Sequence, residues 1–156
     1  MVGAWEAVAA VVDPEIRVVT IEELGILRDV READGRVTVT ITPTYSGCPA
    51  MDVIRADIRT ALRAAGRPDA DVVTVLSPAW STDNISESGR AKLAAAGIAP
   101  PHAARRGGPV PLRLGVRCPR CGSGDTEELS RFGSTACKAL WRCRACAEPF
   151  DHVKAF

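Results

Sequence analysis

The amino-acid sequence predicts an α+β fold, in which a small sheet made of a β-hairpin and a further strand packs with helices, followed by a small cysteine-rich module. Three observations carry this prediction: a strictly alternating hairpin pattern, an apolar stripe at helical spacing directly after it, and two Cys-x-x-Cys pairs in the last third of the chain. A proline- and glycine-rich stretch lies between the two parts. We therefore expect a first domain over residues 1–97, a linker over 98–113 and the cysteine-rich module over 114–156.

The first domain is predicted to begin with a short apolar helix over residues 4–12. Asp13-Pro14 ends it, because the residue before a proline avoids helical backbone angles. Alternating segments over 27–31 and 37–42 then flank Asp34-Gly35, a dipeptide typical of two-residue hairpin turns. The hairpin is expected to bury the face that carries Val37, Val39 and Ile41.

A long helix is predicted over residues 49–65, because apolar side chains recur there at spacings of three and four. Gly66 suits the end of that helix, since glycine readily adopts a left-handed backbone conformation. Residues 71–76 predict a third strand, which we expect to be central in the sheet because it is almost continuously apolar. A last helix is expected over 86–96.

The cysteine-rich module carries Cys118-Pro-Arg-Cys121 and Cys143-Arg-Ala-Cys146, with 21 residues between the pairs. Segments over 126–131 and 136–142 can form a hairpin that brings the pairs together. This arrangement indicates a zinc ribbon, in which all four thiolates bind one ion tetrahedrally. Four protein ligands leave no open coordination position, so the zinc is expected to be structural. A redox or iron–sulfur role for the same thiolates is the alternative.

Two cysteines lie outside these pairs. Cys48 stands before Pro49, which suits the first position of a helix and would make Cys48 the N-cap. Backbone N–H groups and the helix dipole would then lower the pKa of its thiol and make it reactive. A small buried cysteine at a tight turn is the competing interpretation. Cys137 is expected in the second hairpin strand, either as a packed small side chain or as an auxiliary thiol.

The composition argues against membrane association and export. The 156-residue chain has no apolar run near the roughly 20 residues that span a bilayer, and no export signal is recognisable. Six cysteines in such a chain point to thiols and metal ligands in a reducing compartment. We therefore expect a cytoplasmic protein.

The charge distribution and the lack of a recognisable catalytic arrangement restrict the functions that the sequence predicts. Residues 1–97 carry 10 basic and 14 acidic side chains, and residues 98–156 carry 10 and 5. Four thiolates on one zinc ion would leave the second part near +3, about two charges lower, which is too little to favour nucleic acid. His102 and His152 lie beside no nucleophile, and no glycine-rich phosphate loop occurs. We expect an accessory protein with thiol and metal chemistry rather than an enzyme in its own right.

Several segments resemble a known family. Three of them are similar to the iron–sulfur assembly domain of SufT-like proteins: Asp13-Pro14-Glu15-Ile16, residues 21–30, and Thr42-Pro43-Thr44-Tyr45-Ser46-Gly47-Cys48-Pro49. Four more extend the resemblance over nearly the whole chain to the D subunits of bacterial phenylacetyl-CoA epoxidase systems, the PaaD family: residues 76–83, 97–101, 132–140 and 148–151.

This resemblance implies an accessory role in aerobic phenylacetate catabolism, where a multicomponent oxygenase epoxidises the ring of phenylacetyl-CoA. The chain would help to mature or insert an iron or iron–sulfur centre of that system, with Cys48 as the functional thiol that holds the metal or cluster transiently. Asp13 and Glu15 are implied to lie near Cys48 and to support it, together with Thr44. The implied partners are the oxygenase and reductase subunits and iron–sulfur carrier proteins, and a homodimer is left open.

Three other functions compete with metal-centre assembly. The chain could be a structural subunit that binds the oxygenase or its reductase without transferring metal. A nucleic-acid-binding zinc ribbon is disfavoured, because basic and aromatic residues are not interleaved. A thiol–disulfide enzyme is also disfavoured, because Cys48 has no partner cysteine near it in the sequence.

Overall fold

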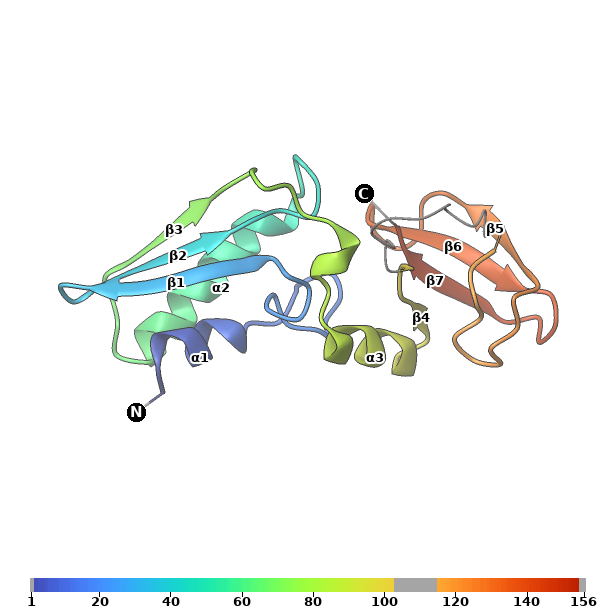
Figure 1. Ribbon diagram of the computed structural model, residues 1–156, viewed down its shortest axis with the longest axis horizontal. Coiled ribbons are helices and arrows are strands. Elements are labelled where there is room, and N and C mark those ends of the chain that lie inside the picture. The colour runs from blue at the N-terminus through green and yellow to red at the C-terminus, as the bar shows by residue number, and fades with distance from the viewer. Residues whose placement is uncertain (1, 103–114, 155–156) are drawn as a thin grey trace. The chain divides into compact units, whose positions relative to one another are not determined.

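The computed structural model describes residues 2–102 and 115–154, and the chain divides into two compact units, Met1–Gly89 and Arg90–Ala155 (Figure 1). The predicted linker over 98–113 lies largely outside the described residues, since 103–114 are not among them. Its first residues, Ile98–Ala99, form a short strand, β4, in the second unit. Among the described helices, none is both long and apolar enough to cross a membrane.

The first unit is built on a hairpin, as predicted. β1 (Leu27–Ala33) pairs antiparallel with β2 (Arg36–Ile41). Between them, Asp34 and Gly35 have φ angles of 49° and 75°. Two successive positive φ values produce the turn whose twist matches that of the flanking strands, which explains why Asp-Gly is favoured there.

The third strand of the first unit, β3 (Ala70–Thr74), is an edge strand and runs parallel to β2. The sheet order is β1-β2-β3, so the prediction of a central third strand was wrong. The physical reason is the crossover through α2 (Ala50–Ala64), which returns the chain beside β2 and leaves the other side of β3 without a neighbouring strand (Figure 1). Val73 is 44% exposed despite its apolar side chain, because it shares a face of the sheet with Thr38 and Thr40, opposite the buried face of β2.

The core of the first unit joins the buried face of β2 to one face of α2. The apolar stripe of α2 is buried as predicted, and α1 (Ala4–Ala9) packs beside α2. The fully buried side chains of these elements are Val8, Val37, Val39, Ile41, Ile54, Ile58 and Leu62. This layer fixes the loop between β2 and α2, because both of its ends enter the core.

Residues 10–26 form turns over this core rather than a regular element. Asp13 organises the first turn, because its Oδ1 accepts hydrogen bonds from the backbone N–H of Glu15 (2.9 Å) and Ile16 (2.6 Å). Further on, the indole Nε1 of Trp80 donates to the carbonyl of Leu24 at 2.8 Å. A 3₁₀ turn (Thr82–Asn84) and α3 (Glu87–Ala95) follow, so the predicted last helix is confirmed.

The second unit is a four-stranded sheet in the order β4-β7-β6-β5. β5 (Thr126–Ser130) and β6 (Lys138–Cys143) form the predicted hairpin. β7 (Pro149–Val153) pairs antiparallel with β6, and β4 pairs parallel with β7. Neither β4 nor β7 was predicted, because both are short and their pairing joins segments distant in the sequence.

A matched pair of glycine variants tests how tightly the turns pack. Gly25 has a φ of 72°, and a Cβ added there would lie 2.5 Å from the Asn84 carbonyl oxygen. Gly35 has a similar φ of 75°, but a Cβ there would meet nothing within 4 Å. We expect Gly35→Ala to cost about 1–2 kcal/mol of unfolding free energy from backbone strain alone. Gly25→Ala should cost more than about 3 kcal/mol, because overpacking adds to that strain.

Urea unfolding of the zinc-loaded chain, followed by circular dichroism, measures both values. Equal losses for the two variants would show that the turn at Gly25 can move away from Asn84.

Candidate metal centre and candidate functional thiol

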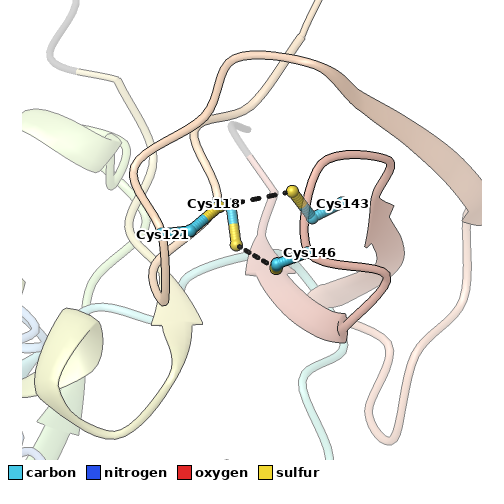
Figure 2. A group of neighbouring side chains, drawn as sticks. All are labelled: Cys118, Cys121, Cys143 and Cys146. Atoms are coloured by element: carbon cyan, nitrogen blue, oxygen red, sulfur yellow. Dashed lines mark hydrogen bonds between the residues drawn. The ribbon is translucent and has the colours of Figure 1, made fainter.

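Four cysteines converge in the second unit. Cys118 and Cys121 come from the loop before β5, Cys143 ends β6, and Cys146 lies in the turn before β7 (Figure 2). All four sulfur atoms lie within 4.8 Å of one another. The Sγ–Sγ distance is 3.8 Å between Cys118 and Cys146 and 3.5 Å between Cys121 and Cys143.

These distances fit a tetrahedral zinc ion. Four sulfurs each about 2.3 Å from one ion would lie about 3.8 Å apart. The chemistry of the donor set agrees, because four thiolates form a closed site that favours zinc. Such an ion supplies a cross-link between the two loops and no catalytic position. The structure therefore brings together all four predicted metal ligands.

Backbone hydrogen bonds and left-handed residues shape the two cysteine-bearing loops so that their sulfurs can reach one ion. In the first loop, the Gly122 N–H donates to the carbonyl of Cys118 at 2.9 Å. Gly122 and Ala147 each directly follow the second cysteine of a pair, and both have left-handed backbones, with φ angles of 75° and 65°. The backbone N–H of Cys146 is the main cause that lowers the pKa of the Cys143 thiol to about 7, which favours the thiolate a metal requires.

The metal centre is part of the core of the second unit. Two of its cysteines, Cys118 and Cys143, are buried in one cluster with Ala99, Val116 and Phe150. Trp141 packs against this cluster. A core of so few side chains is small for an independent unit, so we expect the metal to stabilise the fold itself.

Cys48 lies in the first unit, in the loop between β2 and α2, and is half-buried. The helix begins at Ala50 with Pro49 as its N-cap, so the prediction of Cys48 as the N-cap was wrong, and Cys48 lies one position before the cap. The predicted lowering of its thiol pKa was also wrong, because the pKa is raised. Partial burial is the main cause, and the negative charges of Glu15 and Asp13 add to it.

Two hydrogen-bond donors oppose this rise. The backbone N–H of Ala50 and the hydroxyl of Tyr45 both donate to the sulfur of Cys48 and favour its thiolate. Burial and the two carboxylates outweigh them, so the thiol is protonated at neutral pH. The N-terminal end of α2 thus lowers the pKa of Cys48 through the Ala50 N–H group. This effect is smaller than the rise in pKa that burial and the two carboxylates cause.

The carboxylates of Asp13 and Glu15 lie close enough to Cys48 for their charges to act on it, although they are 35 and 33 positions away in the sequence. Asp13 is buried and held by the turn that it caps. Thr44 belongs to the same loop as Cys48 and is half-buried. Tyr45 was missed by the sequence reasoning, although it is the single tyrosine of the chain and lies three positions before Cys48.

Cys137, the remaining cysteine, is buried next to β6, with its Sγ 3.0 Å from the Thr135 hydroxyl. It lies outside the four-cysteine cluster. This position agrees with the interpretation of Cys137 as a packed small side chain.

Comparisons with known proteins match the two units separately. Residues 4–76 match the family described as iron-sulfur cluster assembly protein, and residues 107–154 match the PaaD zinc beta ribbon domain. A crystal structure of "Domain of Unknown Function DUF59" from Bacillus anthracis covers 58% of this chain and 87% of its own, with a TM-score of 0.54 and 29% identity. The fold and the cysteine cluster thus define a class of protein, an iron–sulfur assembly domain followed by a zinc ribbon.

A relative that matches nearly the whole chain defines the family more closely than the separate domains do. The chain is 44% identical to the D subunit of the "Putative 1,2-phenylacetyl-CoA epoxidase" of Escherichia coli, over 96% of this chain and 90% of that protein. It is also 38% identical to a Fe-S protein maturation auxiliary factor of Porphyromonas gingivalis, over 53% of this chain and 80% of that protein. A Fe-S protein maturation auxiliary factor of Bacillus subtilis is 36% identical over 56% of this chain and 86% of its own. The chain belongs to the PaaD family, the D subunits of phenylacetyl-CoA epoxidase.

Removal of zinc should unfold the second unit. We expect one zinc per chain on purification, and loss of the β5–β7 sheet signals when a strong chelator extracts it, because the ligands are part of the core. Cys118→Ser should reduce zinc content and protection of the sheet against amide hydrogen exchange. Cys137→Ser is the matched control and should retain one zinc. A sheet that stays protected without metal would contradict the structural role.

The titration of Cys48 can be tested by alkylation. The thiolate is the reactive form, so the raised pKa predicts slower reaction with iodoacetamide at pH 8 than for an exposed cysteine. Asp13→Asn and Glu15→Gln each remove a negative charge that raises this pKa, so each should lower it and speed alkylation roughly two- to threefold. Asp13→Asn retains an oxygen acceptor for the turn.

Asp57→Asn, on the exposed side of α2, is the control and should leave the rate unchanged. Mass spectrometry of tryptic peptides separates Cys48 from the other five cysteines. If Asp13→Asn and Glu15→Gln react at the same rate as the wild type and the control, the two carboxylates do not act on the Cys48 sulfur.

Proposed function

We propose that the chain is a non-catalytic accessory subunit of a phenylacetyl-CoA epoxidase system. We further propose that Cys48 transiently holds iron or an iron–sulfur cluster on its way to a metal centre of that system. The observation that carries this proposal is that the carboxylates of Asp13 and Glu15 lie close enough to the Cys48 thiol for their charges to act on it. The names of the relatives, an epoxidase subunit and two Fe-S maturation factors, support the setting.

The electrostatics of Cys48 suit a cation better than a free thiolate. The two carboxylates oppose the negative charge of a thiolate, but they attract a metal ion. When a metal ion binds, the sulfur–hydrogen bond is replaced by a sulfur–metal bond and the proton leaves to solvent. The Ala50 N–H and the Tyr45 hydroxyl then donate to the metal-bound sulfur, and Thr44 supports the same loop.

A single thiol makes this a transfer site rather than a storage site. Fe–S clusters are usually held by four cysteine thiolates, so one Cys48 supplies only part of the ligand set. The remaining ligands would come from an iron–sulfur carrier protein, a recipient oxygenase or reductase subunit, or a second copy of this chain. Incomplete ligation favours release, as delivery requires.

The two parts of the chain then have separate tasks. We assign metal or cluster transfer to the domain over residues 1–97 and a structural zinc ribbon to residues 114–156. Cysteines free of disulfides throughout the described chain agree with a reducing, cytoplasmic location. We propose protein partners only, with neither nucleic acid nor membrane among them.

One observation favours a second candidate function, a structural subunit that binds the oxygenase or reductase without transferring metal. The Cys48 thiol is half-buried and its pKa is raised, as for an inert packed cysteine. In that case the carboxylates would serve the fold, and Cys48 could be replaced without loss of function.

Co-expression separates these two functions. The oxygenase and reductase subunits are produced with the wild-type chain, Cys48→Ser, the Asp13→Asn/Glu15→Gln double variant, or the control Cys137→Ser. Iron and acid-labile sulfide are then measured in each purified subunit. We expect Cys48→Ser to reduce loading of one subunit roughly tenfold or more, the double variant to reduce it less, and Cys137→Ser to match the wild type. Equal loading with all four chains would refute metal transfer through Cys48.

A further inference from the structure

The second unit has a hollow of about 410 Å³, lined by residues of its sheet and of the turn after β5, that includes none of the four clustered cysteines. The hollow forms around Ala139 of β6, a small residue between larger ones. Its cross-strand neighbour is His152 of β7, and Trp141 follows two positions later on the same face. The Trp141 and His152 rings meet edge to face, with centroids 6.0 Å apart.

The rim of the hollow comes from the turn after β5. Phe132 is 72% exposed there, far more than most large apolar side chains of a folded unit. Lys154 lies over its ring, with Nζ 5.0 Å from the centroid, and donates a hydrogen bond to the carbonyl of Arg131 at 3.0 Å. These two contacts place a cation beside an exposed aromatic ring.

The charge of the lining is positive. Arg131 and Lys154 contribute two cations, and Glu128 is the single carboxylate, 4.0 Å from the Arg131 guanidinium. Burial lowers the pKa of His152, so its ring is neutral near pH 7 and adds surface rather than charge. A ligand that carries negative charge would complement this lining.

Trp141, one of the residues that line the hollow, also has an unpaired hydrogen-bond donor among the described residues. Within residues 2–102 and 115–154, the indole Nε1 of Trp141 is buried and has no acceptor. Buried donors are normally paired, and tryptophan N–H groups usually find a partner. The Trp141 side chain, which lines the hollow, is therefore left with an unmet hydrogen bond among the described residues.

We propose that this hollow is a docking site for a segment of a partner protein that carries an apolar or aromatic side chain next to carboxylates. The apolar side chain enters between Phe132, Trp141 and His152 above Ala139, and the carboxylates meet Arg131 and Lys154. Exposed aromatic and arginine side chains around a pocket are the composition typical of interface hot spots. The site does not include Cys48, so the outcome of its test does not affect the proposed metal transfer.

A peptide titration tests the site. The ¹⁵N-labelled, zinc-loaded full chain has three indole signals, one per tryptophan, and that of Trp141 is assigned through the backbone. Three blocked peptides are titrated: acetyl-Glu-Phe-Glu-amide, its Gln-Phe-Gln counterpart and its Lys-Phe-Lys counterpart. We expect the acidic peptide to shift the Trp141 signal with a dissociation constant on the order of 1 mM, the neutral peptide to bind severalfold more weakly, and the basic peptide not to bind.

Two exposed side chains provide variants that should leave the fold intact. Phe132→Ala removes the exposed ring and should weaken binding at least fivefold. Arg131→Glu, at a side chain 87% exposed, should abolish the preference for the acidic peptide. Arg59→Glu on the exposed side of α2 is the control and should bind as the wild type. No shift of the Trp141 signal at 20-fold the expected dissociation constant would overturn the proposal. Equal responses to all three peptides would also overturn it.

Discussion

The burial of the β2 face against α2 is the interaction on which the first unit depends. Val37, Val39 and Ile41 of β2 and Ile54, Ile58 and Leu62 of α2 are all fully buried, and the loop that carries Cys48 joins the two elements. Because both ends of the loop are anchored, the sulfur has a defined position. The buried turn capped by Asp13 then brings two carboxylates to it. Core packing therefore fixes the position of the Cys48 thiol, and the groups that the core positions around the sulfur determine its pKa.

The second unit uses a different source of stability. Its core is small and includes two of the four sulfurs. A metal ion bound there would therefore add the free energy of coordination to that of hydrophobic burial. The two candidate metal sites accordingly behave in opposite ways. Four converging thiolates, close to the spacing that zinc requires, make a closed and permanent site. At Cys48, where we propose transient metal binding, one thiol near two carboxylates supplies only part of a ligand set.

The surface of the second unit shows how a structural module can also serve recognition. The unit that holds the four cysteines also presents rings and cations around the hollow at Ala139, from its strands and from the segments that adjoin them. Phe132 is exposed, and the Trp141 N–H lacks an acceptor among the described residues. An exposed ring of this size is unfavourable on a surface with no partner, whereas a docked apolar side chain would cover it. In the proposed function, such a docking site on the zinc ribbon would help to select the recipient of the metal.

Local patterns in the sequence determined the Asp34-Gly35 hairpin, the amphipathic α2 and the four zinc ligands, because turn chemistry, helical periodicity and Cys-x-x-Cys spacing act over short distances. The tertiary structure alone decided that β3 is an edge strand, that β4 and β7 complete the second sheet, and that Tyr45 contacts Cys48. It also reversed the predicted pKa shift of Cys48. A helix N-terminus can be inferred from Pro49, but the burial of the sulfur and the charges of Asp13 and Glu15, more than thirty positions away, depend on how the chain folds back on itself.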